Sequence, residues 1–150
     1  MITAKRITAA ESNLVINLFD QYRVFYKQPS DTALAKTFIN ARLDNNESVI
    51  FVALSGDVSV GFTQLYPKYS SMRASKNWIL NDLFVDPAHR KQGIGEQLIK
   101  TTMEFAKQQG ATFVQLETAI DNYTAQSLYE AIGFTKQEPD TDFFVYRINV

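Results

Sequence analysis

The sequence predicts a mixed α/β fold, in which a mixed sheet of about seven strands is flanked by about four helices. Apolar residues recur at helical spacing in some stretches and form β-rich runs in others. The two kinds of stretch follow one another in the order β-α-α-β-β-β-α-β-α-β-β, which differs from the regular alternation of a doubly wound sheet. At 150 residues, a single domain over 1–150 is expected.

The first elements are a short strand and two helices. Residues 2–7 are expected to form the strand, and Ser12 is expected to be the N-cap of the first helix. Pro29 interrupts the chain, and Ser30 or Asp31 caps the second helix. The apolar positions at helical spacing are Leu14, Val15, Leu18, Phe19, Tyr22, Phe25 and Tyr26 in the first helix, and Leu34, Phe38, Ile39 and Leu43 in the second.

A hairpin and a series of alternating elements follow. The run 48–54 continues through a Ser-Gly-Asp turn at 55–57 into a partner strand at 58–66. Residues 67–76 are polar and are expected to form a loop before a strand at 78–85. The remaining elements are expected to be a helix at 93–109, a strand at 111–118, a helix at 122–132 and short strands at 134–138 and 142–149.

The composition excludes several kinds of chemistry. The chain has no Cys, which excludes disulfides, a thiolate nucleophile and Cys-ligated zinc or iron–sulfur sites. Its one His, His89, excludes a metal site with two imidazole ligands, and no metal is expected; His89 is expected to be an exposed loop residue. With 15 Lys and Arg against 16 Asp and Glu, the net charge is −1, so no nucleic-acid partner is expected.

No membrane partner or targeting segment is expected. Glu11 and Asp20 interrupt any apolar region of a signal peptide near the N-terminus. No apolar stretch approaches the roughly 20 residues needed to cross a bilayer. A chain without Cys suits a reducing compartment, so a cytoplasmic location is expected.

The segment that is most informative about function lies between the strand at 78–85 and the next helix. It reads Arg90-Lys91-Gln92-Gly93-Ile94-Gly95. A helix N-terminus has unpaired amides and the positive end of the helix dipole, and glycine lets the backbone approach a ligand. The pattern therefore predicts a phosphate-binding loop, the alternative being an ordinary glycine-containing helix start. It lacks the third glycine of a dinucleotide fingerprint and the Gly-Lys-Ser/Thr of a Walker loop.

A strand, an Arg-x-x-Gly-x-Gly loop and a helix in this order resemble the GNAT superfamily of acetyl-CoA-dependent N-acetyltransferases. The resemblance continues at Asn122, at the run Ala-Gln-Ser-Leu-Tyr of 125–129 and at Gly133-Phe134, and it covers most of 48–147. Residues 80–85 and 127–129 are most similar to the diamine, polyamine and amino-acid acetyltransferase branch. The resemblance implies a mostly antiparallel sheet, acetyl-CoA (coenzyme A) as cofactor and a homodimer.

The resemblance also implies where the cofactor binds. The amides of Gln92, Gly93, Ile94 and Gly95 would hold the pyrophosphate, assisted by Arg90 and Lys91. The backbone of Leu83, Phe84 and Val85 would pair with the pantetheine arm and donate a hydrogen bond to the thioester oxygen as charge develops on it. The Leu83 and Val85 side chains are equally suited to the core.

Two residues of the last helix would complete the site. Tyr129 would donate a proton to the departing CoA sulfur or hydrogen-bond it, the alternative being a core aromatic. Asn122 would bind the pantetheine amides, or it is the N-cap of the helix, a role that suits its type and position.

The acceptor amine must lose a proton before it attacks. In the polyamine-like branch a Glu usually stands where this chain has Asn81, and an amide cannot act as a base. Asp82 and Glu117 are candidates to bind or deprotonate the amine, and a water chain is an equal alternative. Strand alternation places Asn81 and Asp82 on opposite faces.

The acceptor site is expected between the first two helices and the nearby loops. Asp20, Tyr22, Tyr26 and Tyr66 would line it, and an acidic and aromatic site suits a small cation. The alternative is that these residues form the amphipathic face of the first helix, which is favoured for Phe25.

The chain is therefore expected to transfer an acetyl group from acetyl-CoA to a primary amine of a small molecule, such as a polyamine, a diamine or an amino-acid-like compound. Two alternatives remain: acetylation of protein or peptide amines, and binding of acyl-CoA without turnover.

Overall fold

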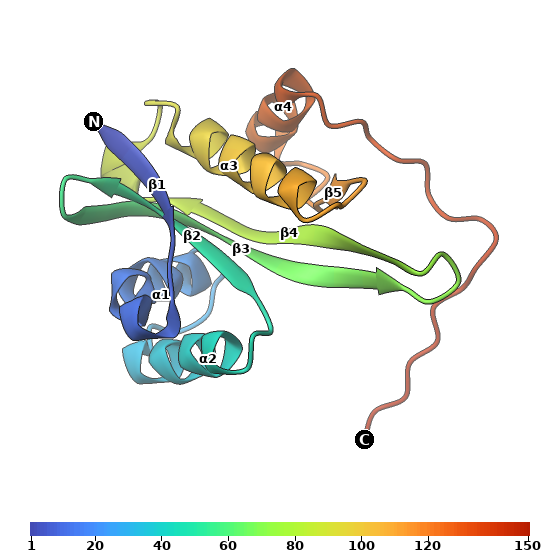
Figure 1. The fold of residues 1–150 in the computed structure, drawn as a ribbon, viewed down its shortest axis with the longest axis horizontal. Helices are drawn as coiled ribbons and strands as arrows, with labels where there is room; N and C mark the ends of the chain where they lie inside the picture. The colour runs from blue at the N-terminus through green and yellow to red at the C-terminus, as the bar shows by residue number, and fades with distance from the viewer. The chain divides into compact units, whose positions relative to one another are not determined.

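A five-stranded sheet in the order β1-β2-β3-β4-β5 organises the N-terminal part of the chain (Figure 1). The computed structural model describes residues 1–150, which fall into two units, Met1–Glu117 and Thr118–Val150. The elements are β1 (Ile2–Arg6), the 3-10 helix η1 (Ala9–Leu14), α1 (Ile16–Phe25), α2 (Thr32–Asp44), β2 (Val49–Ser55), β3 (Val58–Ser70), β4 (Ser75–Val85), the 3-10 helix η2 (Pro87–His89), α3 (Ile94–Gln108), β5 (Val114–Gln115) and α4 (Tyr123–Ile132). As far as α4, the strands and α-helices follow the predicted order.

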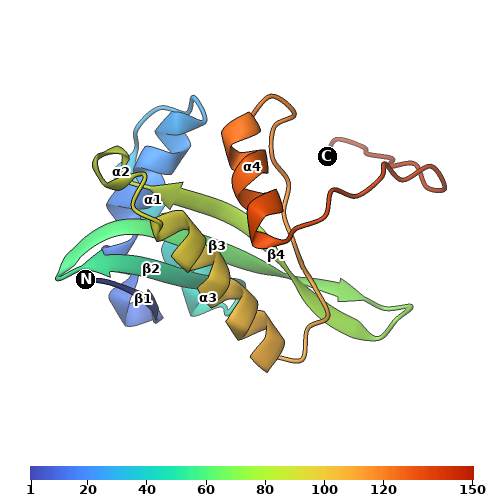
Figure 2. The same ribbon diagram turned by 90° about the horizontal axis from the view of Figure 1, so that it is seen from above.

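The sheet is mixed and mostly antiparallel, as expected. Strands β1 to β4 pair antiparallel with their neighbours in sequence, and only β4 and β5 pair in parallel. Helices α1 and α2 cover one face of the sheet and α3 crosses the other, as Figures 1 and 2 both show. The unit Met1–Glu117 therefore has one helical layer on each side of its sheet.

Each face of the sheet has its own apolar core. On the face of α1 and α2, buried side chains of the two helices pack with those of β2, β3 and β4; the cluster is Ile7, Val15, Leu18, Phe19, Ala35, Ile39, Ile50, Val52, Phe62 and Phe84. On the other face, the ring of Phe105 in α3 contacts Phe51 and Trp78. Complete burial of one such aliphatic or aromatic side chain stabilises the fold by roughly 1.5–3 kcal/mol.

The helix caps explain where the first two helices begin. Asp31 caps α2, since its Oδ1 accepts a hydrogen bond of 3.0 Å from the Leu34 amide, as one of the two expected caps would. Ser12 is not an N-cap. The chain enters the helical region earlier, at Thr8, whose amide donates to Glu11 Oε1 at 3.1 Å, and Ser12 lies within η1.

The β3–β4 hairpin is longer than the pattern of the sequence predicts. The expected loop at 67–76 is wrong, because strand pairing continues as far as Ser70 and Ser75. A short turn with Ala74 at φ 49° closes the hairpin. The polar side chains of this stretch are compatible with a two-stranded ribbon that extends past the rest of the sheet, where both faces meet solvent (Figure 1).

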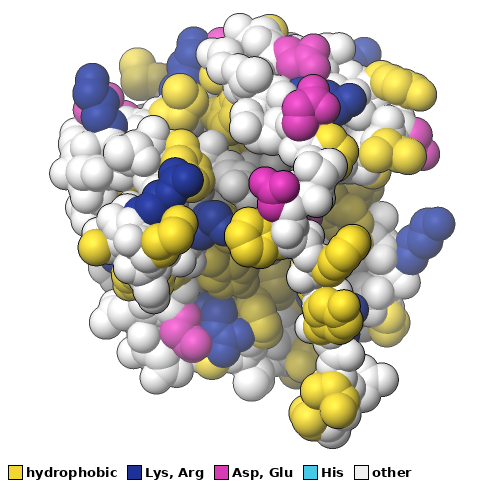
Figure 3. All heavy atoms as spheres, turned by 90° about the vertical axis from the view of Figure 1, so that its right-hand side faces the viewer, with side chains coloured by type: hydrophobic (Ala, Val, Ile, Leu, Met, Phe, Trp, Pro, Cys, Tyr) yellow, Lys and Arg dark blue, Asp and Glu magenta, His cyan; other side chains and the backbone are white.

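The strand count of about seven is too high. The expected strand at 111–118 contracts to Val114–Gln115, and 134–138 and 142–149 form no strand. The closing segment has the aromatic and β-branched composition of a strand, but a strand also needs a partner ladder, and none is formed here. Its large apolar side chains are exposed: Phe143, Phe144, Val145, Tyr146, Ile148 and Val150. Hydrophobic side chains stand at the surface on the side of the molecule drawn in Figure 3.

No helix is both long enough and apolar enough to cross a membrane. No group of three or more His, Cys, Asp or Glu side chains is arranged to hold a metal ion.

Candidate functional site

A β-bulge at Asn81 shapes the middle of β4. Gln64 of β3 pairs with Asp82 and Leu65 pairs with Leu80, so Asn81 is the extra residue. A bulge of this kind adds one residue to a strand and changes which face the following side chains occupy. Here Trp78, before the bulge, contacts Phe105 of α3.

After the bulge, the even-numbered side chains point to the other face of the sheet. Phe84, an even-numbered residue like Trp78, contacts Tyr22 of α1. The expectation that Asn81 and Asp82 lie on opposite faces is wrong, because regular alternation does not hold across a bulge. The Asn81 amide in fact donates to Asp82 Oδ1 at 2.9 Å.

The edge of β4 is open beyond its short contact with β5. The parallel pairing joins only Trp78 with Val114 and Ile79 with Gln115. The segment Leu83–Val85 therefore has β3 on one side and no strand on the other. Phe84 is buried, and its two neighbours are half-buried. Unpaired strand edges can hydrogen-bond an extended ligand as a further strand would.

The loop after β4 holds two residues in the left-handed region of backbone conformation. Lys91 has φ 63° and Gly93, the N-cap of α3, has φ 78°. Left-handed residues also occur in anion-binding nests, where they help to turn backbone amides toward one side. The Arg90 side chain folds back, with its Nε donating to the Val85 carbonyl at 3.0 Å. Lys91 and Gln92 are exposed.

The first turn of α3 adds further amides to this loop. The first hydrogen bond of the helix joins the Gln97 amide to the Gly93 carbonyl at 3.0 Å. The amides of Ile94, Gly95 and Glu96 precede it and have no acceptor within the helix. Together with the positive end of the helix dipole and the nearby basic side chains, they suit a phosphate or pyrophosphate group.

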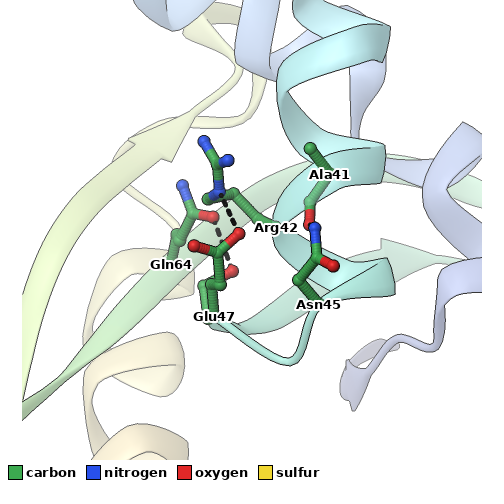
Figure 4. A network of polar contacts seen from close by, with 6 residues as sticks. Ala41, Arg42, Asn45, Glu47 and Gln64 are labelled. Atoms are coloured by element: carbon green, nitrogen blue, oxygen red, sulfur yellow. Dashed lines mark hydrogen bonds and ion pairs between the residues drawn. The ribbon is translucent and has the colours of Figure 1, made fainter.

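A buried polar network crosses the sheet at the bulge. Ser48 Oγ donates to Gln64 Oε1 at 2.8 Å, and Gln64 Nε2 donates to Asp82 Oδ2 at 2.6 Å. In Figure 4 the Gln64 side chain lies beside Glu47, and a dashed line marks the hydrogen bond that Gln64 Oε1 accepts from Ser48. Asp82 is 4 % exposed and no basic side chain forms an ion pair with it. A buried carboxylate is costly without a cation, so this one suits a positively charged ligand.

Two tyrosines surround this carboxylate. Burial raises the pKa of Tyr22 far above its usual value, and the charge of Asp82 and a hydrogen bond to it raise it further. Burial also raises the pKa of Tyr66 to about 12, again with a contribution from the charge of Asp82. Both phenols are therefore neutral near pH 7 and can act as hydrogen-bond donors and acceptors. The Tyr26 ring lies 4.9 Å from that of Tyr22 and is largely exposed.

The structure places three other predicted residues outside this cluster. Asp20 is buried, and its carboxylate accepts from Ser30 Oγ at 2.6 Å and from the Asp31 amide at 2.8 Å, which joins α1 to the start of α2. These two bonds lower the pKa of Asp20 and assign it a structural role. Glu117 is exposed and lies after β5 rather than in a strand. His89 is part of η2, with its side chain about one-third exposed.

Asn122 and Tyr129 belong to the second unit, Thr118–Val150. Asn122 is the N-cap of α4, because its Oδ1 accepts from the Ala125 amide at 3.2 Å. The alternative interpretation of Asn122 as a cap is therefore confirmed, and its second expected role stays a prediction. The Tyr129 ring lies 6.0 Å from that of Phe134, and its side chain is half-buried.

Sequence reasoning misses the residues that connect the site. Ser48 and Gln64 are not among the predicted residues. The signal that the sequence offers is the polar Gln64 within an apolar strand run, and the structure shows that this residue is fully buried. Gly61 is also missed: a Cβ there would lie 3.1 Å from the Phe84 carbonyl oxygen and 3.3 Å from side-chain atoms of Ile94 and Leu98. The absence of a side chain at Gly61 allows the start of α3 to pack closely on β3.

Comparisons with known proteins agree with this geometry. Residues 15–134 match the model of the acetyltransferase (GNAT) family. The uncharacterized N-acetyltransferase YhfO of Bacillus subtilis (strain 168) is 42 % identical over 146 residues, which is 97 % of this chain and 96 % of the relative. A crystal structure of a probable acetyltransferase matches this chain with a TM-score of 0.87 and 33 % sequence identity. The match covers 99 % of this chain and 97 % of the chain in that crystal structure.

A more distant structure has the same fold. The aminoglycoside N-acetyltransferase AAC(6')-Iy, in complex with CoA, has a TM-score of 0.79 at 20 % identity and covers 99 % of this chain and 96 % of its own.

Proposed function

Because this chain belongs to the GNAT family of acetyltransferases and is an N-acetyltransferase, we propose that it transfers an acetyl group from acetyl-CoA to a primary amine of a small molecule. The observation that carries the proposal is the arrangement along β4. A buried carboxylate without a cation lies at the bulge, and the open strand edge leads from there into the loop of unpaired amides. One site suits an amine and the other a pyrophosphate.

The residues of the loop and of β4 would hold the cofactor. The amides from Gln92 to Gly95 face a pyrophosphate, and Lys91 supplies positive charge next to them. The backbone of Leu83–Val85 pairs with the pantetheine arm along the open edge of β4. When bound, acetyl-CoA supplies a thioester whose carbonyl carbon bonds to the amine nitrogen as its carbon–sulfur bond breaks.

The acceptor would bind on the face of α1 and α2. Its ammonium group binds at the Tyr22 hydroxyl, which is hydrogen-bonded to Asp82, and near the Tyr66 hydroxyl. The Asp82 carboxylate receives the proton that makes the amine nucleophilic, because an amine with a pKa near 10 is almost entirely protonated at neutral pH. The neutral Asn81 amide orients the Asp82 carboxylate through the bond at 2.9 Å. Tyr129 of α4 provides a proton for the departing sulfur.

An amine panel tests the activity. The chain is incubated with acetyl-CoA and polyamines, diamines, amino acids and peptides, and a thiol reagent measures the CoA released. The chain has no Cys, so the reagent reacts only with the product. We expect release with at least one small amine and little with peptides. Tight CoA binding with no release for any amine would count against the proposal.

Two variants test the assigned roles. We expect Asp82→Asn to lower kcat/KM by about a hundredfold or more, as is usual for the loss of a group that moves a proton. Asp57→Asn, in the exposed turn between β2 and β3, is the matched control and should have wild-type activity. Tyr129→Phe should lower kcat and leave the Kd for CoA nearly unchanged; equal kcat in both proteins would remove Tyr129 from the mechanism.

We also propose that the chain forms a homodimer, on the basis of its resemblance to the family, and that it is located in the cytoplasm, since it has no Cys. Light scattering measures the mass in solution, and a mass near the 17.0 kDa of one chain would contradict the homodimer.

A further inference from the structure

A hollow of about 720 Å³ lies beside Tyr66, on the face of the sheet covered by α2. Its aromatic walls are Phe38, Tyr66 and Tyr69, and its charged residues are Arg42 and Glu47. It opens next to the residue whose hydroxyl lies in the electrostatic field of Asp82. A group attached to an amine bound near Asp82 can therefore extend into this hollow.

Arg42 is held in one orientation there. Its Nε donates to Glu47 Oε1 at 3.2 Å, and its guanidinium carbon lies 4.3 Å from the centre of the Phe38 ring. Its two terminal nitrogens make no hydrogen bond within the chain, and they point away from Glu47 in Figure 4. The side chain is 24 % exposed, so this unpaired edge is only partly open to solvent.

The unpaired edge of Arg42 has the geometry of a carboxylate site. A guanidinium is planar, and two parallel N–H donors on one edge match the two oxygens of a carboxylate. Stacking on Phe38 and the bond from Nε fix the plane of the group before a ligand arrives, which lowers the entropy lost on binding. The Glu47 carboxylate occupies Nε and leaves this edge available.

A continuous set of contacts connects Arg42 with the proposed amine site. Arg42 bonds Glu47, the next residue Ser48 bonds Gln64, and Gln64 bonds Asp82. A chain of polar contacts between α2, β3 and β4, buried from Ser48 to Asp82, thus joins the wall of the hollow to the buried carboxylate. One end of this chain of contacts is the Asp82 carboxylate, and the other is the Arg42–Glu47 ion pair, in which the terminal nitrogens of Arg42 have no acceptor.

We propose that the acceptor carries a carboxylate as well as a primary amine, and that the terminal nitrogens of Arg42 bind this carboxylate. The inference rests on the proposed function and selects the amino-acid-like class from the three classes of small amine considered above. A diamine or polyamine would place a second ammonium group against the unpaired N–H donors of Arg42, which is unfavourable because both groups only donate hydrogen bonds and both are positively charged, and Glu47 is already paired with Arg42.

Matched acceptors test this selection. Each of several amino acids is compared with its carboxamide and with its decarboxylated amine, for example lysine, lysinamide and 1,5-diaminopentane. We expect kcat/KM for the amino acid to exceed that for either partner without the carboxylate by about tenfold to a hundredfold, the range for a lost charge-assisted pair. Equal or better acetylation of the decarboxylated amine would overturn the inference and leave the proposed function intact.

Variants of Arg42 locate the effect. In Arg42→Gln the preference for the carboxylate should disappear, mainly through a higher KM for the amino acid, while the rate with the decarboxylated amine changes little. Arg42→Lys keeps the charge without the paired donors and should restore part of the preference. Arg73→Gln, an exposed residue of the β3–β4 turn, is the matched control and should keep the full preference. A preference that survives in Arg42→Gln would contradict the assignment.

A binding measurement separates the two proposals. Calorimetry in the presence of CoA compares the amino acid with its carboxamide for wild type and Arg42→Gln. Carboxylate-dependent binding that is lost in the variant supports the inference even if no acetylation occurs, a result that would refute only the proposed function. Absence of both binding and turnover would overturn both.

Discussion

At the scale of single residues, Gly61 controls how closely α3 approaches the sheet. A methyl group at this position would meet the backbone oxygen of Phe84 at 3.1 Å and the side chains of Ile94 and Leu98 at 3.3 Å. We expect Gly61→Ala to lower the free energy of unfolding by about 1–3 kcal/mol, as overpacking does, and to weaken CoA binding by displacing the first turn of α3. Urea unfolding and calorimetry measure the two effects.

Gly56→Ala is the control for Gly61→Ala. Gly56 lies in the β2–β3 turn with φ 61°, and no atom lies within 4 Å of the position that an added Cβ would occupy. This variant should lose stability through backbone strain and keep wild-type affinity for CoA. Equal CoA affinity in Gly61→Ala and wild type would show that the close contact does not position the loop.

The Tyr66 hydroxyl makes stability depend on pH in alkaline solution. Burial, with the charge of Asp82, raises the pKa of Tyr66 to about 12 from an ordinary value of 10.0. Between these pH values the unfolded chain loses a proton that the folded chain keeps, so the stabilising contribution present below pH 10 is lost as the pH rises toward 12. We expect Tyr66→Phe to weaken the fall in unfolding free energy over this range.

Urea unfolding followed by circular dichroism at pH 9, 10 and 11 measures this dependence. Tyr22 contributes in the same direction in both proteins, since burial raises its pKa too, so a residual slope is expected in the variant. An identical slope in wild type and Tyr66→Phe would contradict the assignment to Tyr66.

Residue types indicate much of the site, but the directions of the side chains depend on the register of the strands. The chemistry of Asp82, Tyr22 and Tyr66 predicts that they bind or deprotonate the acceptor amine. The structure does bring these three residues together. Asp20 is equally suitable by type, yet its oxygens bind the start of α2. The bulge at Asn81 arises from pairing between two strands, which a single sequence does not reveal.

At the scale of elements, the start of α3 depends on the left-handed conformation of Gly93. Gly93 before the helix has φ 78° and Gly110 after it has φ 77°, and neither has an atom within 4 Å of an added Cβ. We expect Gly93→Ala and Gly110→Ala to destabilise the fold by a similar amount, roughly 1–2 kcal/mol, because alanine is strained in this region. Thermal unfolding measures the cost.

Only the first of these two variants should affect the cofactor. Gly93→Ala changes the direction of the amides at the helix start, so we expect the Kd for CoA to rise about tenfold or more, while Gly110→Ala keeps the wild-type Kd. Because the two substitutions are matched in residue type and in φ, a rise in Kd of equal size in both would attribute the loss to stability alone.

The elements that sequence patterns predict well are those stabilised locally. Helix α3 has a continuous apolar stripe, and α2 and α4 have side-chain caps at Asp31 and Asn122 that a sequence shows directly. Strand β5 is much shorter than the expected strand at 111–118, because the length of an edge strand is decided by its partner. The sequence pattern underestimates the β3–β4 ribbon for the same reason.

At the scale of the whole molecule, burial is distributed unevenly along the chain. Every buried side chain belongs to Met1–Glu117, and none of the residues 118–150 is buried. Segments with few buried apolar contacts open at lower free energy and exchange their amide hydrogens sooner. We therefore expect the slowest exchange in β2, β3 and β4, and faster exchange in α4 and in the segment after it.

Adding CoA should change this pattern in two separate places. The loop Arg90–Gly95 should gain protection, because the proposed pyrophosphate site occupies amides that have no acceptor within the helix. Helix α4 should gain protection as well if Asn122 and Tyr129 contact the cofactor, since binding to the folded form stabilises it against local opening. Hydrogen–deuterium exchange with mass spectrometry measures both, and peptides from β1 and β2 serve as the internal control. Protection at the loop without any at α4 would confine the cofactor site to Met1–Glu117 and remove both α4 residues from it.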